Sequence, residues 1–236
     1  MLRPGLTQLA ADLLEANREG DELRVEGLKS QLDEVDPYAL DGDDERLAFW
    51  INLYNAKVIE EFRVRPRVGH LFRHRKLFDE ASFRVGGDEF SLNVIEHGLL
   101  RRNSKPPYSF RRVLSSGDRR LEAAPSRLDP RIHFALNCAA ASCPRVHAYE
   151  PELIIEQLER ATRAYFETES SFDLRTGQLT LPYLMKLYSR DFGRGAHELW
   201  AAQYLSAEAR ARVLGDSGPE WNGSLAYGKY DWRIDS

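Results

Sequence analysis

The sequence lacks the features that mark secreted and membrane-spanning proteins. It has two cysteines among 236 residues, which are too few for a disulfide framework. Its first residues do not include the long apolar run of a signal peptide or of a membrane helix. We therefore expect a cytoplasmic protein that makes no contact with a membrane and keeps both thiols reduced.

A surplus of charge of one sign is also missing. The 33 Lys and Arg residues nearly balance the 37 Asp and Glu residues, giving a formal net charge of −4, and the two signs are interspersed along the chain. This distribution argues against nucleic acid as a partner. What is present is 42% hydrophobic residues, enough for one sizeable core in a soluble globular protein.

The spacing of apolar residues predicts a mainly helical protein. Helical periods occur at 6–18, 22–32, 45–62, 92–101, 151–167, 185–192 and 196–205, and alternating segments with Gly-containing turns predict β-hairpins at 82–91 and 172–181. Because the strands form local hairpins rather than regular βαβ units, the fold class predicted is α+β, a single domain with a small antiparallel sheet. Residues 1–43 are expected to form a helical segment packed on a core of residues 44–236.

The helix predicted at 45–62 is apolar on nearly every side, so we expect it in the middle of the fold. It carries Asn52, Tyr54 and Asn55, which makes these polar groups candidates for a covered site. A buried amide must find hydrogen-bond partners. The two asparagines therefore either fix neighbouring backbone or line a site, and the sequence leaves both alternatives open.

The helix predicted at 92–101 carries a second set of polar residues, Glu96 and His97, next to its apolar face. Neighbouring residues of an α-helix point about 100° apart, so these two side chains are expected to address different partners. For Glu96 we expect a buried position and a partner outside its own helix, such as a backbone N–H, Arg131 or a histidine.

Both cysteines lie in the stretch 129–144, D-P-R-I-H-F-A-L-N-C-A-A-A-S-C-P. Apolar residues alternate at 132, 134 and 136, which predicts a strand, and the alanines after Cys138 favour a helical turn. A thiol at a strand-to-helix junction meets unpaired backbone N–H groups that lower its pKa. The alternative is that Cys138 is an ordinary packed cysteine.

A nucleophilic cysteine needs a base within hydrogen-bond reach and a third group that orients the base. We take Cys138 as the nucleophile, His97 or His133 as the base, and Glu96, Asn52 or Asn55 as the orienting group. Cys143 is the alternative nucleophile, although Pro144 after it disfavours a helical backbone there. The residues assigned to binding are Asn52, Tyr54, Arg131 and Cys143.

Zinc is a second chemical interpretation, with ligands drawn from Cys138, Cys143, His97, His133 and His147. However, C-x4-C without a second cysteine pair is a weak zinc pattern. We therefore expect no metal and no cofactor. A third interpretation is a non-catalytic scaffold or protein-binding module, in which the polar residues form a buried network and another protein is the partner.

Three segments together resemble the family called domain of unknown function 547. They are F-W-I-N-L-Y-N-A at 49–56, F-S-L-N-V-I-E-H-G-L-L-R at 90–101, and the cysteine-containing stretch at 129–144. The resemblance implies that the paired asparagines, the Glu-His pair and the cysteines belong to one module, with Cys138 the more characteristic of the two thiols.

These residues lead us to expect a cysteine-dependent hydrolase or acyl-transferase with a papain-like or transglutaminase-like arrangement. Its substrate would be a small molecule or peptide with an amide, peptide or thioester bond.

Overall fold

The computed structural model describes residues 5–64, 69–193, 195–215, 221 and 223–234. The chain divides into two compact units, Met1–Leu158 with Asp231–Ser236, and Glu159–Tyr230. Both combine helices with short, mainly antiparallel strands, which confirms a mainly helical α+β fold. The papain-like or transglutaminase-like arrangement stays a prediction.

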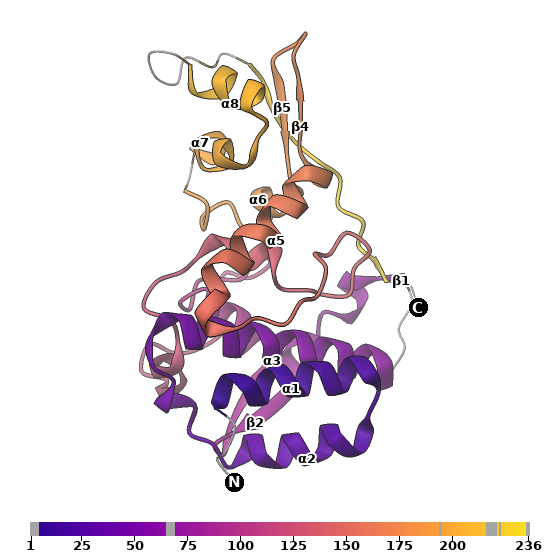
Figure 1. Ribbon diagram of the computed structural model, residues 1–236, viewed down its shortest axis with the longest axis vertical. Helices are drawn as coiled ribbons and strands as arrows, with labels where there is room; N and C mark the ends of the chain where they lie inside the picture. The colour runs from indigo at the N-terminus through magenta and orange to yellow at the C-terminus, as the bar shows by residue number, and fades with distance from the viewer. Residues whose placement is uncertain (1–4, 65–68, 194, 216–220, 222, 235–236) are drawn as a thin grey trace. The chain divides into compact units, whose positions relative to one another are not determined.

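Three helices form the base of the first unit: α1 (Leu6–Glu19), α2 (Glu22–Asp33) and α3 (Gly42–Val64). In Figure 1, α1 lies beside α3, and α2 follows on the other side of α1. Every residue of α3 from 47 to 58 is buried, because apolar side chains surround this helix. The expectation that it lies in the middle of the fold is confirmed for this unit.

Shorter elements surround α3 in the first unit. The hairpin predicted at 82–91 is confirmed: β2 (Ser82–Val85) pairs antiparallel with β3 (Asp88–Ser91). The remaining elements are the 3-10 helices η1 (Pro37–Ala39), η2 (Leu71–His74), η4 (Arg119–Ala123) and η6 (Pro151–Leu153), the helix α4 (Leu77–Glu80), and the strands β1 (Gly69–His70) and β7 (Arg233–Ile234), which pair with each other.

The helix predicted at 92–101 is present, but most of it is a π-helix, η3 (Val94–Leu100). Its wider turn continues past its end, since the backbone N–H of Arg101 donates to the carbonyl of Glu96 at 2.8 Å. All seven residues of η3 are buried. Glu96 and His97 are therefore interior groups, and π-helical turns occur frequently at functional sites.

The strand predicted before Cys138 is wrong. Residues Pro130–Phe134 form the 3-10 helix η5, and the side chain of Asp129 caps it by accepting the N–H of Arg131. An Asp cap followed by Pro at the first helical position is a helix start. Residues 132–136 are all buried, so the alternation did not separate an inner face from an outer one.

The strand-to-helix junction at Cys138 is wrong for the same reason. Cys138 lies in a loop after η5, and residues 139–150 form turns and loop without a helix. The thiol therefore receives no stabilisation from a helix N-terminus. The argument that His133 faces away from Cys138 also loses its basis, since it assumed a straight strand.

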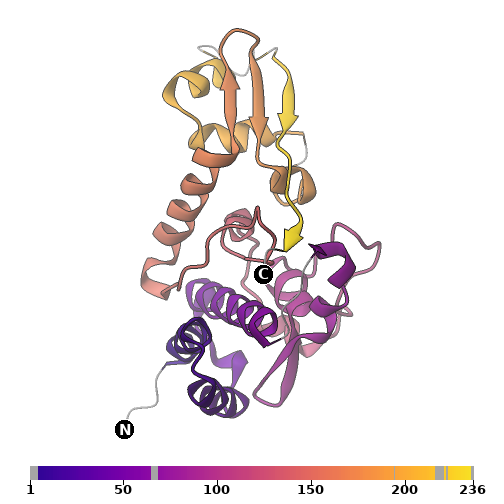
Figure 2. The ribbon, with the colours of Figure 1, turned by 90° about the vertical axis from the view of Figure 1, so that its right-hand side faces the viewer.

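The second unit contains a three-stranded sheet. The hairpin predicted at 172–181 is confirmed as β4 (Ser171–Asp173) and β5 (Gln178–Leu181), and β6 (Leu225–Tyr227) adds to β5 in parallel (Figure 2). The boundary between the two units falls within α5 (Ile154–Glu169). The other helices are α6 (Tyr183–Leu187), α7 (His197–Ala201), η7 (Ala202–Tyr204) and α8 (Ala207–Leu214).

Candidate functional site

The two cysteines form a thiol pair in the loop that follows η5. The Sγ atoms of Cys138 and Cys143 lie 2.6 Å apart, and the backbone N–H of Cys138 donates to Cys143 Sγ at 3.0 Å. Both residues are partly exposed. We call residues 137–144 the thiol loop. A thiolate at Cys143 would thus receive hydrogen bonds from a backbone N–H and from the neighbouring thiol, which favours its charged form.

Asn137 closes the thiol loop at both of its ends. Its amide Nδ2 donates to the carbonyl of Pro144 at 2.7 Å, and its Oδ1 accepts the N–H of Ala139 at 2.7 Å. Ala139 has a φ of 66°, a left-handed conformation that a residue with a Cβ adopts at a cost. The side chain of Asn137 therefore holds the residue before Cys138 next to the residue after Cys143.

Asn55 attaches the thiol loop to α3. Its Nδ2 donates to the carbonyl of Ala135 at 3.0 Å, and its Oδ1 accepts the N–H of Asn137 at 3.0 Å. One turn earlier, Asn52 makes the same pair of bonds with the backbone of Tyr149, at 2.8 and 2.9 Å. Of the two alternatives for these asparagines, the structure has them fixing backbone.

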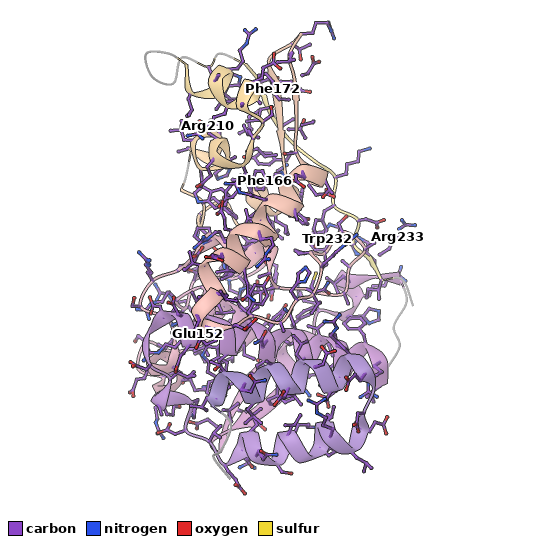
Figure 3. The ribbon with its side chains drawn as sticks, in the orientation of Figure 1. Glu152, Phe166, Phe172, Arg210, Trp232 and Arg233 are labelled. Atoms are coloured by element: carbon purple, nitrogen blue, oxygen red, sulfur yellow. The ribbon has the colours of Figure 1, made fainter. Side chains whose placement is uncertain are left out.

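The chain returns to the thiol loop at its C-terminal segment, where Figure 3 labels Trp232 and Arg233. The N–H of Ala141 donates to the carbonyl of Arg233 at 2.8 Å, and the N–H of Asp231 donates to Ser142 Oγ at 2.9 Å. Residues between the two cysteines are therefore bonded to a segment about 90 positions further along the chain.

A second polar cluster forms around η3. Glu96 is buried, with 7% of its surface exposed, and it accepts a hydrogen bond from the Tyr54 hydroxyl at 3.2 Å. Tyr54 belongs to α3, so the partner of Glu96 lies outside its own helix, as predicted. Burying a carboxylate is costly unless it is paired, and the tyrosine hydroxyl supplies one such donor.

His97 is enclosed in the same cluster, with 1% of its surface exposed. Its Nδ1 lies 2.9 Å from a guanidinium nitrogen of Arg101 and 3.4 Å from Glu96 Oε1. A guanidinium can only donate, so the shorter contact makes Nδ1 an acceptor and places the ring proton on Nε2. The carboxylate of Glu96 approaches the same nitrogen within ion-pair distance, so the expectation that Glu96 and His97 address different partners is wrong for this contact.

The other side of His97 continues into a chain of hydrogen bonds. Its Nε2 lies 3.3 Å from the Tyr108 hydroxyl, which donates to Asn93 Oδ1 at 2.8 Å, and Asn93 Nδ2 donates to Asp79 at 2.6 Å. Burial of the Tyr108 hydroxyl, with the charges of Glu96 and Asp79, raises its pKa. Tyr108 therefore stays protonated and keeps the direction of this chain fixed.

The two clusters share α3 as their support. Tyr54 holds Glu96, and the next residue, Asn55, holds the thiol loop. Consecutive side chains on an α-helix diverge by about 100°, so the two clusters occupy adjoining sectors around this helix. That Cys138 lies within reach of His97 or His133 stays a prediction.

The remaining predicted residues lie in η5. His133 is buried there, with 3% of its surface exposed. The guanidinium of Arg131 contacts the carboxylate of Asp129 through Nε at 3.0 Å and a terminal nitrogen at 2.6 Å, and it also donates to the carbonyl of Ile155 at 3.4 Å. Arg131 thus fixes the start of η5.

The second unit contains a pair of polar residues that the sequence did not single out. His197 Nδ1 lies 2.5 Å from the Tyr227 hydroxyl, and His197 Nε2 lies 3.0 Å from the carbonyl of Ser189. The two line a cavity of about 380 Å³ with Ser189, Gly195, Glu198 and Leu225. Because Tyr227 follows His197 by 30 positions, no local spacing connects them.

In the part of the chain that the structure describes, no group of three or more His, Cys, Asp or Glu residues is arranged to hold a metal ion. Among the helices of that part, none combines the length and the apolar character needed to cross a membrane.

The protein is thus a mainly helical α+β protein in which one buried helix, α3, supports two polar groups. Asn55 of α3 bonds the loop that contains the two thiols, and Tyr54 bonds Glu96 of the buried Glu-His cluster. The family model described as protein of unknown function, DUF547, matches residues 38–166. The chain belongs to this family, and the match includes α3, η3 and the thiol loop. Comparisons with curated proteins and with solved structures give no match.

Proposed function

We propose that this protein is a cysteine-dependent hydrolase or acyl-transferase that acts on an amide, peptide or thioester bond. The observation that carries the proposal is the convergence of the Cys138 backbone N–H and thiol on Cys143 Sγ, at 3.0 and 2.6 Å. Hydrogen bonds to a thiolate lower its pKa, and a thiolate is the nucleophilic form of cysteine.

The backbone N–H decides where the charge rests in the pair. It points at Cys143 and cannot move with the proton, so we assign the thiolate to Cys143 and the proton to Cys138. This reverses the order expected from the sequence. Attack on a carbonyl carbon would form a thioester at Cys143, and the leaving group would take the Cys138 proton. Water or a second acceptor would then release the acyl group.

His97 is the base that the proposal takes from the helix η3. Its Nδ1 accepts from Arg101 and its Nε2 faces the Tyr108 hydroxyl, so His97 would accept a proton only after one of these two contacts opens. Glu96 and Tyr54 would then serve to keep the surroundings of His97 fixed, as positioning residues. That His97 takes a proton from the thiol pair is part of this proposal.

The test is the rate of alkylation by iodoacetamide as a function of pH, with each modified cysteine located by mass spectrometry. We expect Cys143 to react well below the free-thiol pKa of about 8.5. Cys143→Ser should abolish the fast reaction, while Cys138→Ser should preserve it, because the serine hydroxyl can still donate and the backbone N–H of residue 138 is unchanged. Both variants should keep the parent melting temperature, since the substitution changes volume little.

A different distribution of the label changes the conclusion. Fast labelling that disappears in Cys138→Ser and persists in Cys143→Ser would return the nucleophile to Cys138. Neither thiol reacting faster than free cysteine at pH 7 would refute the enzyme proposal.

A non-catalytic binding module is the second candidate function. It is favoured by Asn52 and Asn55, whose amide oxygen and nitrogen both bond backbone groups. Such side chains act as internal supports, which a scaffold needs as much as an enzyme does. Slow labelling of both cysteines, with serine variants that lose about 1–3 kcal/mol of stability because a hydroxyl replaces a packed thiol, is the result expected of a scaffold.

A further inference from the structure

We propose that Cys138 and Cys143 form a reversible disulfide, which makes the thiol loop a site of oxidative modification. The partner is a low-molecular-weight disulfide of the glutathione type. The inference involves the same thiols as the proposed hydrolase site. It depends only on how the two side chains are held, and it holds whether or not the protein is an enzyme.

The first argument is proximity. The two Sγ atoms are in direct contact at 2.6 Å, in a loop whose cysteines are five positions apart. Both residues are partly exposed, so a small disulfide can approach them. The same N–H that stabilises a thiolate at Cys143 supplies the reactive form, because exchange begins with the attack of a thiolate on a disulfide sulfur.

The second argument is that the loop is held closed by groups other than sulfur. Asn137 bonds the carbonyl of Pro144 at 2.7 Å, and the N–H of Cys143 donates to the carbonyl of Ala140 at 2.9 Å. From the α3 side, Asn55 holds the N–H of Asn137 at 3.0 Å. The entropy of bringing the two thiols together is therefore already spent in the reduced protein.

The chemistry proceeds in two exchange steps. The Cys143 thiolate attacks one sulfur of the small disulfide, forms a mixed disulfide and releases one small thiolate. Cys138 then loses its proton to the released thiolate and attacks Cys143 Sγ, which expels the second small thiolate, and this thiolate takes up a proton from solvent. The protein loses two electrons and two protons, one from Cys138 and one given to solvent when the Cys143 thiolate forms, and the small disulfide takes up the equivalent and is reduced to two thiols. Excess small thiol reverses both steps.

Formation of this bond would remove the nucleophile from the proposed site. The Cys143 sulfur that accepts the Cys138 N–H would become one half of the disulfide and could no longer attack a carbonyl. Oxidation would thus switch the thiol loop off, and reduction would restore it.

The experiment equilibrates the full chain with mixtures of reduced and oxidised glutathione, stops exchange with acid, alkylates the remaining thiols and reads masses. The parent should pass from two alkylated thiols to a species that has lost two hydrogens, with little glutathione adduct. Cys138→Ser and Cys143→Ser should each stop at a single glutathione adduct. Independent glutathione adducts on both cysteines of the parent, or disulfide-linked dimers, would overturn the proposal.

The side chain of Asn137, here called the clamp, joins the two ends of the thiol loop. Its substitution tests whether this closure favours the disulfide. Asn137→Ala should lower the equilibrium constant for disulfide formation at least tenfold, which corresponds to about 30 mV in reduction potential. Asn52→Ala is the matched control, because it removes a backbone-fixing asparagine of α3 that bonds Tyr149 instead. An equal decrease in both variants would contradict a role for the clamp.

The two proposals fail separately. If the two thiols form the disulfide as expected, but in the reduced protein are alkylated no faster than free cysteine, the disulfide proposal stands and the hydrolase proposal fails. Fast alkylation without disulfide formation does the opposite.

Discussion

The side chain of Asn52 and the backbone of Tyr149 form a closed pair, in which the amide nitrogen donates to the carbonyl at 2.8 Å and the amide oxygen accepts the N–H at 2.9 Å. Asn52 is fully buried, and Tyr149 has 1% of its surface exposed. Neither backbone group can turn to water without moving the chain, so this pair fixes the segment before η6 on α3.

Asn52→Ala should lower the free energy of unfolding by about 1–3 kcal/mol for each backbone group of Tyr149 that it leaves unpaired. Chemical denaturation measured by circular dichroism would give the change. Gln8→Ala removes an exposed amide that bonds Asp12 on α1 and is expected to have little effect. Equal stabilities for the two variants would contradict the role of Asn52.

Tyr54 and Glu96 should be energetically coupled. Tyr54→Phe removes a buried hydrogen bond to a carboxylate and is expected to cost about 1.5–3 kcal/mol. The comparison is Tyr204→Phe, which removes a tyrosine-to-glutamate bond to the more exposed Glu159 and should cost about 0.5–1.5 kcal/mol.

A double-mutant cycle of Tyr54→Phe with Glu96→Gln, followed by denaturant unfolding, measures the interaction directly. Additive effects of the two substitutions would show that the 3.2 Å contact contributes nothing to stability.

The turn of the β2–β3 hairpin offers a pair of adjacent glycines that differ in one respect. Both have positive φ, 58° at Gly86 and 84° at Gly87. A Cβ at Gly86 would lie 2.4 Å from the carbonyl oxygen of Val35, whereas a Cβ at Gly87 would meet nothing within 4 Å. The two positions therefore share conformational strain but not the clash.

Gly87→Ala should cost about 1–2 kcal/mol from the left-handed backbone alone. Gly86→Ala should add about 1–3 kcal/mol, because the backbone of Val35 must move. Thermal unfolding of both variants checks the difference, and a Gly86→Ala protein as stable as Gly87→Ala would show that the contact relaxes freely.

The carboxyl group of Asp231 should titrate at unusually low pH. The side chain and then the backbone N–H of Arg233 donate to it and hold its pKa at about 2, against 3.8 for an unperturbed group. The folded pKa is depressed, so the stabilisation is fully present above pH 3.8 and is lost as the pH falls toward about 2.

NMR titration of the side-chain carboxyl carbons tests this. In Arg233→Gln the pKa of Asp231 should rise but stay below 3.8, because the backbone N–H of residue 233 still donates. Asp173, whose pKa is lowered chiefly by the hydroxyl of Thr176, is the internal control and should not move. If the pKa of Asp231 is the same in Arg233→Gln as in the parent, a group other than the Arg233 side chain lowers it.

Sequence patterns predicted the elements whose causes are local. The apolar periodicity of α3 and the glycines of the two hairpin turns depend on neighbours a few positions away, and these predictions are confirmed. Residues 130–134 show how a local pattern can mislead. Their alternation resembled a strand, while the Asp-Pro start favoured the 3-10 helix that is observed.

The sequence identified which residues of the candidate site are buried, but not which groups they bond. Asn52, Asn55 and Glu96 were expected to be covered, because they lie beside apolar stripes, and all three are buried. Their partners could not be read from the sequence, since Asn52 and Tyr149 are 97 positions apart and Tyr54 and Glu96 are 42 apart. Asn137 was missed because a clamp on a loop has no periodic signature.

The first unit is built from two separate stretches of chain, and its last residues, from Asp231 onward, follow the whole of the second unit. On the ribosome, Ala141 and Ser142 therefore emerge well before the partners in 231–233 that bond them. At about 5–20 residues per second the interval is roughly 4–18 s. During that time the thiol loop has its bonds to Asn137 and Asn55 but lacks those to residues 231–233. The order of synthesis therefore makes the docking of the C-terminal segment the last step in forming this unit.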